Sequence, residues 1–262
     1  MPRPIITLTT DFGVSDHFAA VMKGVILGIC RDATIVDISH EIGAFGIPEA
    51  AFLLAQAYSY FPRGAVHVVV VDPGVGTSRR PILAEAAGQY FVAPDNGVLS
   101  MIFAREKHKV RWVNSEKYFL KPVSQTFHGR DIFSPVGAHL ACGARPAGMG
   151  KLITDYMRLH IEQPVRTARR GWTGAVLKID RFGNLITNFP AQDFPDIEKR
   201  PFEMSIGLEI VHRLAHNYAE WGPGELFVIV GSSGYLEVSV SQASAAKRLG
   251  CGVGAPIELR IL

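Results

Sequence analysis

Two side chains of opposite charge, Asp72 and Arg79, follow a run of four valines at positions 68–71. Such a run predicts a strand buried on both faces of a parallel sheet, and ligands of open α/β sheets bind just beyond the carboxyl ends of such strands. We therefore expect Asp72 to face a cleft, with Arg79 folded back to keep its carboxylate ionised and oriented. The pair is a candidate for catalysis. The alternative is an ordinary surface ion pair.

Two more polar positions could contribute to the same chemistry. Asp11 ends a second strand-like segment, where it could accept hydrogen bonds from ribose hydroxyls or hold a metal. Alternatively, Asp11 or Asp16 caps the helix that follows. His128 lies in a polar cluster between Phe127 and Phe133, and a histidine there could steer or accept a proton near neutral pH.

Three turn-like segments carry weaker signals. Asn96 lies in an Asp-Asn-Gly turn, which by itself favours a structural role. Asp180 and Asn184 could contact a charged amine or the edge of a purine, or could form an ordinary hairpin turn. The hydroxyls of Ser232 and Ser233, with nearby backbone amides, could bind a carboxylate.

Charge and composition exclude several classes of protein. The 27 Lys and Arg residues exceed the 24 Asp and Glu residues by only 3, and no basic run suggests nucleic-acid binding. The glycines after Asp72 lack the lysine of a phosphate-binding loop, and no zinc-ligand spacing occurs. The three cysteines are far apart, which predicts a reducing compartment without a disulfide framework. With no signal peptide or membrane-spanning run expected, we predict a cytoplasmic protein.

The pattern of elements predicts an α/β protein in two domains. Strand and helix signals alternate through residues 1–164, which favours a largely parallel sheet flanked by helices. Short β-patterned segments separated by Gly, Pro and Asn dominate residues 171–262, which favours a smaller antiparallel β-barrel.

Taken together and in this order, the motifs resemble those of the S-adenosyl-L-methionine (SAM) hydroxide adenosyltransferases, relatives of the fluorinase and chlorinase. The resemblance covers nearly the whole chain. It implies a homotrimer whose sites lie between the N-terminal domain of one subunit and the C-terminal domain of the next. It also implies that water and SAM give adenosine and L-methionine, with SAM as a substrate and no cofactor or metal.

The resemblance also implies roles for individual residues. The catalytic Asp-Arg-His set of the family falls on Asp72, Arg79 and His128. The expected substrate-binding residues are Asp11 for the ribose, Asp180 for methionine and Asn184 for adenine, together with Phe45, Asn96, Phe127, Ser232 and Ser233.

Departures from the halide enzymes favour hydrolysis. The fluorinase has Tyr at the position of Asp72, a halide-contacting Thr at Val75, a halide-binding Ser at Gly129 and Arg at Ser233. An anionic Asp72 would repel a halide and would instead hold or deprotonate a water. The alternatives are a halide-using adenosyltransferase, a metal-dependent phosphohydrolase built on Asp11, Asp72, His128 and Asp131, and a non-catalytic nucleoside- or SAM-binding protein.

Overall fold

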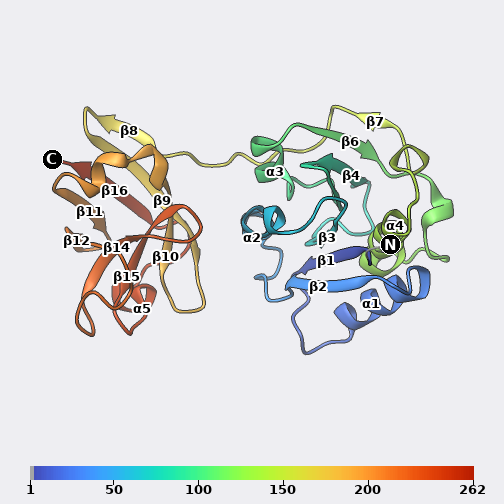
Figure 1. Ribbon diagram of the computed structural model, residues 1–262, viewed down its shortest axis with the longest axis horizontal. Helices are drawn as coiled ribbons and strands as arrows, with labels where there is room; N and C mark the ends of the chain where they lie inside the picture. The colour runs from blue at the N-terminus through green and yellow to red at the C-terminus, as the bar shows by residue number, and fades with distance from the viewer. Residues whose placement is uncertain (1–2) are drawn as a thin grey trace. The chain divides into compact units, whose positions relative to one another are not determined.

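The structure, a computed structural model, describes residues 3–262, which form two compact units, residues 3–161 and 162–262. Figure 1 shows the elements of each unit. No helix among the described residues is long and apolar enough to cross a membrane.

The N-terminal unit is built on a seven-stranded mixed sheet of order β2-β1-β3-β5-β4-β6-β7. The four strands β2, β1, β3 and β5 are mutually parallel, whereas β4, β6 and β7 pair antiparallel. The prediction of a largely parallel sheet is therefore correct for only one side of it. The strands are β1 (Ile5–Thr10), β2 (Thr34–Ser39), β3 (Val66–Val70), β4 (Pro81–Ala86), β5 (Gln89–Pro94), β6 (His108–Trp112) and β7 (Leu152–Ile153).

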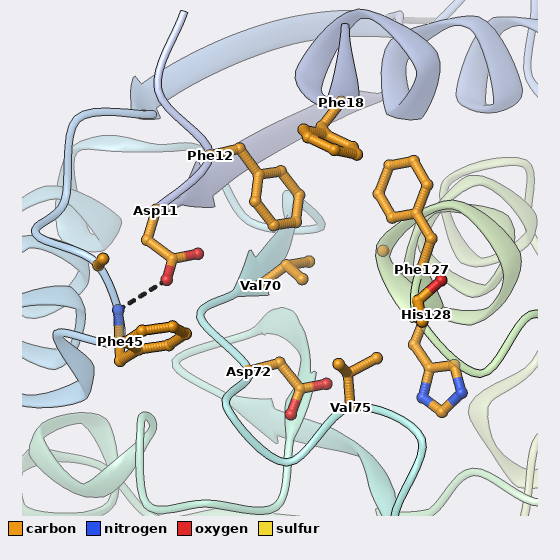
Figure 2. Close-up of a pocket in the computed structure, with 12 residues that line it drawn as sticks. Asp11, Phe12, Phe18, Phe45, Val70, Asp72, Val75, Phe127 and His128 are labelled. Carbon is orange, nitrogen blue, oxygen red and sulfur yellow. Dashed lines mark hydrogen bonds between the residues drawn. The ribbon is translucent and has the colours of Figure 1, made fainter. Parts of the chain in front are cut away.

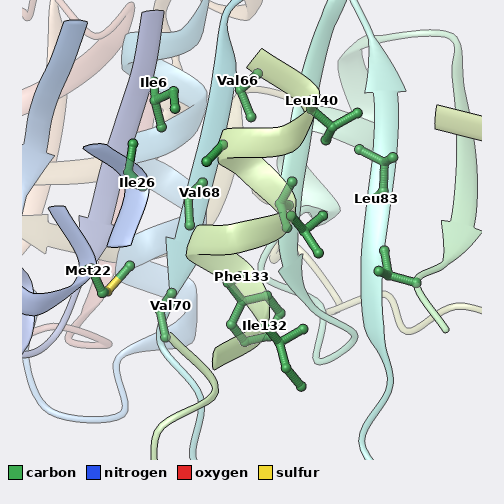
Figure 3. Packing of buried hydrophobic residues seen from close by; sticks show 14 of the residues in the cluster. Ile6, Met22, Ile26, Val66, Val68, Val70, Leu83, Ile132, Phe133 and Leu140 are labelled. Atoms are coloured by element: carbon green, nitrogen blue, oxygen red, sulfur yellow. The ribbon is translucent and has the colours of Figure 1, made fainter. Parts of the chain in front are cut away.

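Helices pack on both faces of this sheet. On one face, α1 and α4 enclose a core with the even-numbered valines of β3, as Figure 3 shows. On the other face, α2 and the 3₁₀ turn after it pack so that Tyr58 meets Phe91 of β5. The helices are α1 (Phe18–Ile29), α2 (Ile47–Ala57), α3 (Ser100–Arg105) and α4 (Ser134–Ala141), and a π-helical turn (Gly129–Phe133) leads into α4.

Strand β3 is the centre of the sheet and is buried along its whole length, as the apolar run predicts. Its one polar residue, His67, is fully buried and accepts a hydrogen bond at Nδ1 from the Thr7 hydroxyl (2.7 Å). The Gln89 amide donates to the Phe61 carbonyl oxygen, so its own oxygen faces His67 Nε2 at 3.3 Å and accepts from it. His67 is therefore neutral, and burial lowers its pKa to about 4.

One disulfide contradicts the prediction drawn from cysteine spacing. Cys30, the C-cap of α1, is bonded to Cys142, the C-cap of α4, with their Cα atoms 5.8 Å apart. The two cysteines are separated by 112 residues, so local spacing carried no sign of the pairing. They meet because α1 and α4 lie side by side on one face of the sheet (Figure 1). Cys251 is a free thiol.

The C-terminal unit is a nine-stranded sheet curled around its own apolar core. The strand order runs from β12 through β11, β16, β9, β10, β15 and β14 to β13, and β8 pairs with β9. The pairing is antiparallel except for the short parallel pair of β13 and β14, so the predicted antiparallel barrel is confirmed only as a curled, mostly antiparallel sheet. The elements are β8 (Val165–Ala168), β9 (Gly171–Ile179), β10 (Leu185–Pro190), β11 (Phe202–Ile206), β12 (Glu209–Val211), β13 (Leu214–Ala215), β14 (Leu226–Val230), β15 (Tyr235–Val240), α5 (Ala245–Leu249) and β16 (Pro256–Ile261).

The buried His67 should make the fold sensitive to acid. Its pKa is about 4 in the folded state and 6.5 for an ordinary solvated histidine, so the unfolded chain binds more protons between these pH values. The stabilisation from neutral His67 is complete above pH 6.5 and is lost as the pH falls towards 4, by on the order of 3 kcal/mol. Urea unfolding of the wild type and of His67→Gln at pH 7 and pH 4.5 should show a smaller loss in the variant. Equal losses would contradict this role.

Reduction of the disulfide should lower stability. A cross-link that closes a loop of this size contributes about 4–5 kcal/mol in the chain-entropy account. We expect Cys142→Ser, or a reductant added to the wild type, to lower the urea midpoint. Cys251→Ser is the matched control because it removes a free thiol, and it should leave the midpoint unchanged. A Cys142→Ser midpoint equal to that of oxidised wild type would contradict the prediction.

Candidate active site

A cavity of about 330 Å³ lies at the carboxyl ends of the neighbouring parallel strands β1 and β3. Figure 2 shows Asp11, which follows β1, and Asp72, which follows β3, on its wall. His128, just before the π-helical turn, is on the wall too. The strand ends thus gather the polar residues that the sequence places in a cleft, as expected for an open α/β sheet.

Arg79 joins the other two members of the predicted catalytic set. Its Nε donates to Asp72 Oδ1 at 3.0 Å, and its Nη2 donates both to Asp72 Oδ2 and to His128 Nδ1, the latter at 3.0 Å. The side chains of Arg79 and Asp72 keep only 7% and 5% of their surface exposed. This burial excludes the alternative of a surface ion pair, because solvent does not screen the interaction.

The hydrogen bonds assign the protons of this set. Arg79 can only donate, so His128 Nδ1 accepts and a neutral His128 carries its proton on Nε2. Burial and the positive charge of Arg79 lower the pKa of His128. Burial raises the pKa of Asp72, opposed by the charge and hydrogen bonds of Arg79. Asp72 is thus a carboxylate of raised basicity held in one orientation, while His128 presents a donor.

The loop between Asp72 and Arg79 is shaped by its own hydrogen bonds. The Thr77 hydroxyl donates to the Gly74 carbonyl oxygen at 2.7 Å and accepts from the Arg79 amide at 3.3 Å, which turns the chain back. Gly76 has a φ of 77°, and a Cβ at this position would overlap the carbonyl oxygen of Gln125. Only glycine therefore lets this loop contact the segment that leads to His128.

Asp11 and Phe45, both predicted to bind substrate, are brought together. Asp11 Oδ2 accepts a hydrogen bond from the Phe45 amide at 2.9 Å (Figure 2). The cap residue of α1 is His17, and it makes no side-chain cap bond, so neither Asp11 nor Asp16 has the capping role considered as the alternative. The Phe45 side chain is 69% exposed beside the cavity.

The end of β1 is held by a polar network that runs from the buried Thr10 and His40 to the more exposed Asp37 and Lys23. The Thr10 hydroxyl contacts His40 Nδ1 at 2.8 Å, and His40 Nε2 lies 3.0 Å from Asp37 Oδ1. Asp37 also pairs with Lys23, which acts with His40 to lower its pKa against the effect of burial. This network fixes the residue that immediately precedes Asp11.

An aromatic wall closes one side of the cavity. Phe127, a predicted site residue, lies with its ring centroid 5.8 Å from that of Phe12 and 5.2 Å from that of Phe18. Sequence reasoning did not assign Phe12 and Phe18 to the site. Phe18 matches the apolar spacing of α1, which is typical of a core position, yet it is 36% exposed and lines the cavity.

Asn96 lies behind the site and is not among the residues that line the cavity. Its Nδ2 donates to the Val71 carbonyl oxygen at 2.8 Å, and its Oδ1 accepts from the Val98 amide at 3.2 Å. Asn96 thus holds the backbone one residue before Asp72.

The remaining predicted residues lie in the C-terminal unit. Asp180 Oδ1 accepts from the Asn184 amide at 2.8 Å, and its Oδ2 accepts from Asn184 Nδ2 at 2.8 Å, so the two form one turn after β9. The Ser233 hydroxyl donates to Glu237 Oε1 at 3.4 Å. Glu237 is 4% exposed, and the sequence analysis did not assign it a role.

Among residues 3–262, no group of three or more His, Cys, Asp or Glu side chains is arranged to hold a metal ion. The Asp11, Asp72, His128 and Asp131 set of the phosphohydrolase alternative does not come together as a ligand cluster. Asp131 instead pairs with Arg130 and accepts from the Ser124 amide at 2.8 Å, which holds the loop before His128.

Profiles of one protein family match both units of the chain. That of the SAM hydroxide adenosyltransferase N-terminal domain matches residues 6–150, and that of the C-terminal domain matches residues 174–258. The chain belongs to the SAM hydroxide adenosyltransferase family. The resemblance seen in the sequence motifs is thereby confirmed.

The chain matches individual members of this family and related proteins over almost its full length. An (R)-S-adenosyl-L-methionine hydrolase of Salinispora tropica is 37% identical, covering 97% of this chain and 96% of the relative. A hydrolase of the same name from Thermus thermophilus is 34% identical, with 98% and 99% covered. A fluorinase of Nocardia brasiliensis is 26% identical, with 99% and 97% covered. The crystal structure of an uncharacterized conserved protein from Thermotoga maritima matches with a TM-score of 0.92 at 36% identity, covering 97% of this chain and 99% of that chain.

Removing the charge of Arg79 should change the pKa of His128. Because that charge helps to lower the pKa of His128, Arg79→Gln should raise it, and the nearby Asp72 carboxylate should then favour the protonated form. NMR titration of the histidine side chains would test this. His139, whose pKa is lowered by burial alone, is the internal control and should not move. An unchanged His128 pKa in the variant would contradict the assignment.

Proposed function

We propose that this protein hydrolyses SAM to adenosine and L-methionine, with Asp72 as the general base that activates the attacking water. The observation that carries the proposal is the buried carboxylate of Asp72, held by two hydrogen bonds from Arg79 on the wall of the cavity. The names of the full-length relatives from Salinispora tropica and Thermus thermophilus support the same reaction.

The proposed reaction is a direct displacement at C5′ of the substrate. Asp72 accepts a proton from water, and the water oxygen forms a bond to C5′ while the C5′–sulfur bond breaks. The bonding electrons go to sulfur, so L-methionine leaves as a neutral thioether and adenosine gains the hydroxyl group. Because the leaving group departs without negative charge, the reaction needs neither a general acid nor a metal ion to stabilise it. The protein must align the water and exclude other solvent.

His128 has a secondary part in this proposal. Its Nδ1 is occupied by the Arg79 guanidinium, and the ring also bonds the Ser124 backbone, so its Nε2–H would be shared between that backbone group and the oxygen of the attacking water. A donor on the water oxygen and an acceptor on its proton together fix the direction of attack. We therefore assign proton acceptance to Asp72 and orientation of the water to His128.

The proposed binding roles follow the chemistry of each group. Asp11 accepts hydrogen bonds from the ribose hydroxyls, beside Phe45 and the aromatic wall that includes Phe127. Asn184 contacts adenine, while Asp180 with Ser232 and Ser233 contacts the methionyl part. Asn96 acts on the site through the backbone before Asp72, because its amide is hydrogen bonded there. No cofactor is required.

A halide-using adenosyltransferase is the second candidate, favoured by the match to the Nocardia brasiliensis fluorinase at 26% identity. The buried Asp72 carboxylate on the cavity wall weighs against it, because a halide placed there would meet a like charge.

We further propose a homotrimer in the cytoplasm, in which residues 162–262 of a neighbouring subunit complete each site. The assembly rests on the family resemblance, and the location is the expectation drawn from the sequence. Light scattering of the purified protein would give the number of subunits. The Cys30–Cys142 disulfide weighs against a reducing compartment, and fractionation of cells that make the protein would test the location.

Asp72→Asn should abolish most turnover while leaving adenosine binding intact. A positioned general base contributes roughly 100- to 10,000-fold to the rate, and asparagine keeps the shape of the side chain without its basicity. Adenosine and methionine would be followed by chromatography from SAM, with chelator present and halide absent, and adenosine binding by calorimetry.

Asp16→Asn is the matched control for Asp72→Asn, because Asp16 is an exposed carboxylate outside the cavity. Full activity of Asp72→Asn would overturn the assignment of the base. Failure of the wild type to form both products in equal amounts would overturn the hydrolase function.

A further inference from the structure

Glu237 is a buried carboxyl group on β15 of the C-terminal unit that the proposed reaction does not use. It is 4% exposed, and its neighbours in the strand, Leu236 and Val238, point into the core. A buried carboxyl group is unfavourable unless it is hydrogen bonded, so its partners indicate what it does.

Its two carboxyl oxygens join two separate loops. The Tyr218 hydroxyl, from the connection between β13 and β14, donates to Oε2 at 3.0 Å. The Ser233 hydroxyl, from the turn between β14 and β15, donates to Oε1 at 3.4 Å. Glu237 is therefore the group that sets the position of the Ser233 hydroxyl relative to the Tyr218 loop.

The turn is built to receive this carboxyl group. A Cβ at Gly231 would overlap the carboxyl group of Glu237, so the backbone of the turn approaches it as closely as glycine allows. The Gly231 amide donates to the Tyr235 carbonyl oxygen at 2.9 Å, and the Gly234 amide donates to the Gly231 carbonyl oxygen at 2.9 Å, which closes the turn.

Glu237 interacts electrostatically with Asp180, which lies in the turn after β9 and is also predicted to bind substrate. Burial raises the pKa of Glu237, and the negative charge of Asp180 raises it further. The pKa of Tyr218 is raised to about 12 by burial and by the same two carboxyl groups. Asp180, Ser233 and Tyr218 thus share one neighbourhood, with Glu237 in contact with the latter two.

We propose that Glu237 is a positioning residue for the methionyl part of the substrate, acting through Ser233 and Tyr218. This inference rests on the proposed function, which places Asp180, Ser232 and Ser233 at that part of SAM. Glu237 acts on binding because it fixes the turn that contacts the methionyl group. It takes no part in the proton transfer assigned to Asp72.

The test compares Glu237→Ala with Glu237→Gln in the SAM assay, with methionine and adenosine as inhibitors. Alanine removes both hydrogen bonds and should raise KM and weaken methionine inhibition by roughly tenfold, as expected for the loss of hydrogen bonds to a charged group, with kcat within about twofold. Adenosine lacks the methionyl part, so its inhibition should not change. Glutamine can contact both hydroxyls and should restore most of the affinity for methionine.

Glu258→Ala is the matched control, since it removes an exposed glutamate from β16 of the same unit. Equal loss of methionine and adenosine inhibition in Glu237→Ala, or no loss of either, would overturn the proposal. If that variant does not fold, Tyr218→Phe removes one of the two hydrogen bonds, and unchanged methionine inhibition in it would overturn the proposal as well. A wild type that forms no adenosine and methionine would instead refute the hydrolase function, so the two failures are distinct.

Discussion

The buried guanidinium of Arg79 is the interaction on which the site depends. It donates to both oxygens of Asp72 and to Nδ1 of His128, so one cation connects the segment after β3 with the segment before α4. It also lies over the ring of Phe133, 5.2 Å from the ring centroid, which gives it an apolar support. Because arginine cannot lose its proton, it stays a donor to both partners at any pH at which the protein is folded.

The fold supplies two supports for this arrangement. The parallel pairing of β1 and β3 places Asp11 and Asp72 at the same edge of the sheet. Behind that edge, side chains hold the chain through hydrogen bonds to backbone groups or to other side chains. Asn96 holds the carbonyl of Val71, Asp131 holds the amide of Ser124, and Thr10 is held by His40. The polar residues of the sequence motifs therefore fall into two groups. Asp11, Asp72 and His128 line the cavity, whereas Asn96 and Asp131 support the backbone behind it.

The sequence predicted the elements whose signals are local. The apolar run before Asp72 predicted a strand buried on both faces, and β3 is one. The antiparallel half of the sheet was missed although a signal existed. Only Ala87 and Gly88 separate β4 from β5, and so short a connection can join antiparallel strands alone. The Cys30–Cys142 bond had no local signal, since its partners are 112 residues apart and meet only through helix packing. Phe18 and Glu237 were missed for the same reason. The apolar spacing of a helix or the alternation of a strand predicts on which face a side chain lies, but it does not predict what that side chain contacts.

Gly76 determines how this site can change in evolution. The position has a left-handed backbone and no space for a Cβ against the carbonyl of Gln125. Every substitution there pushes the segment bearing Asp72 away from the segment bearing His128, whatever the chemical character of the new side chain. Position 76 therefore stays closed to variation as long as the two segments must touch.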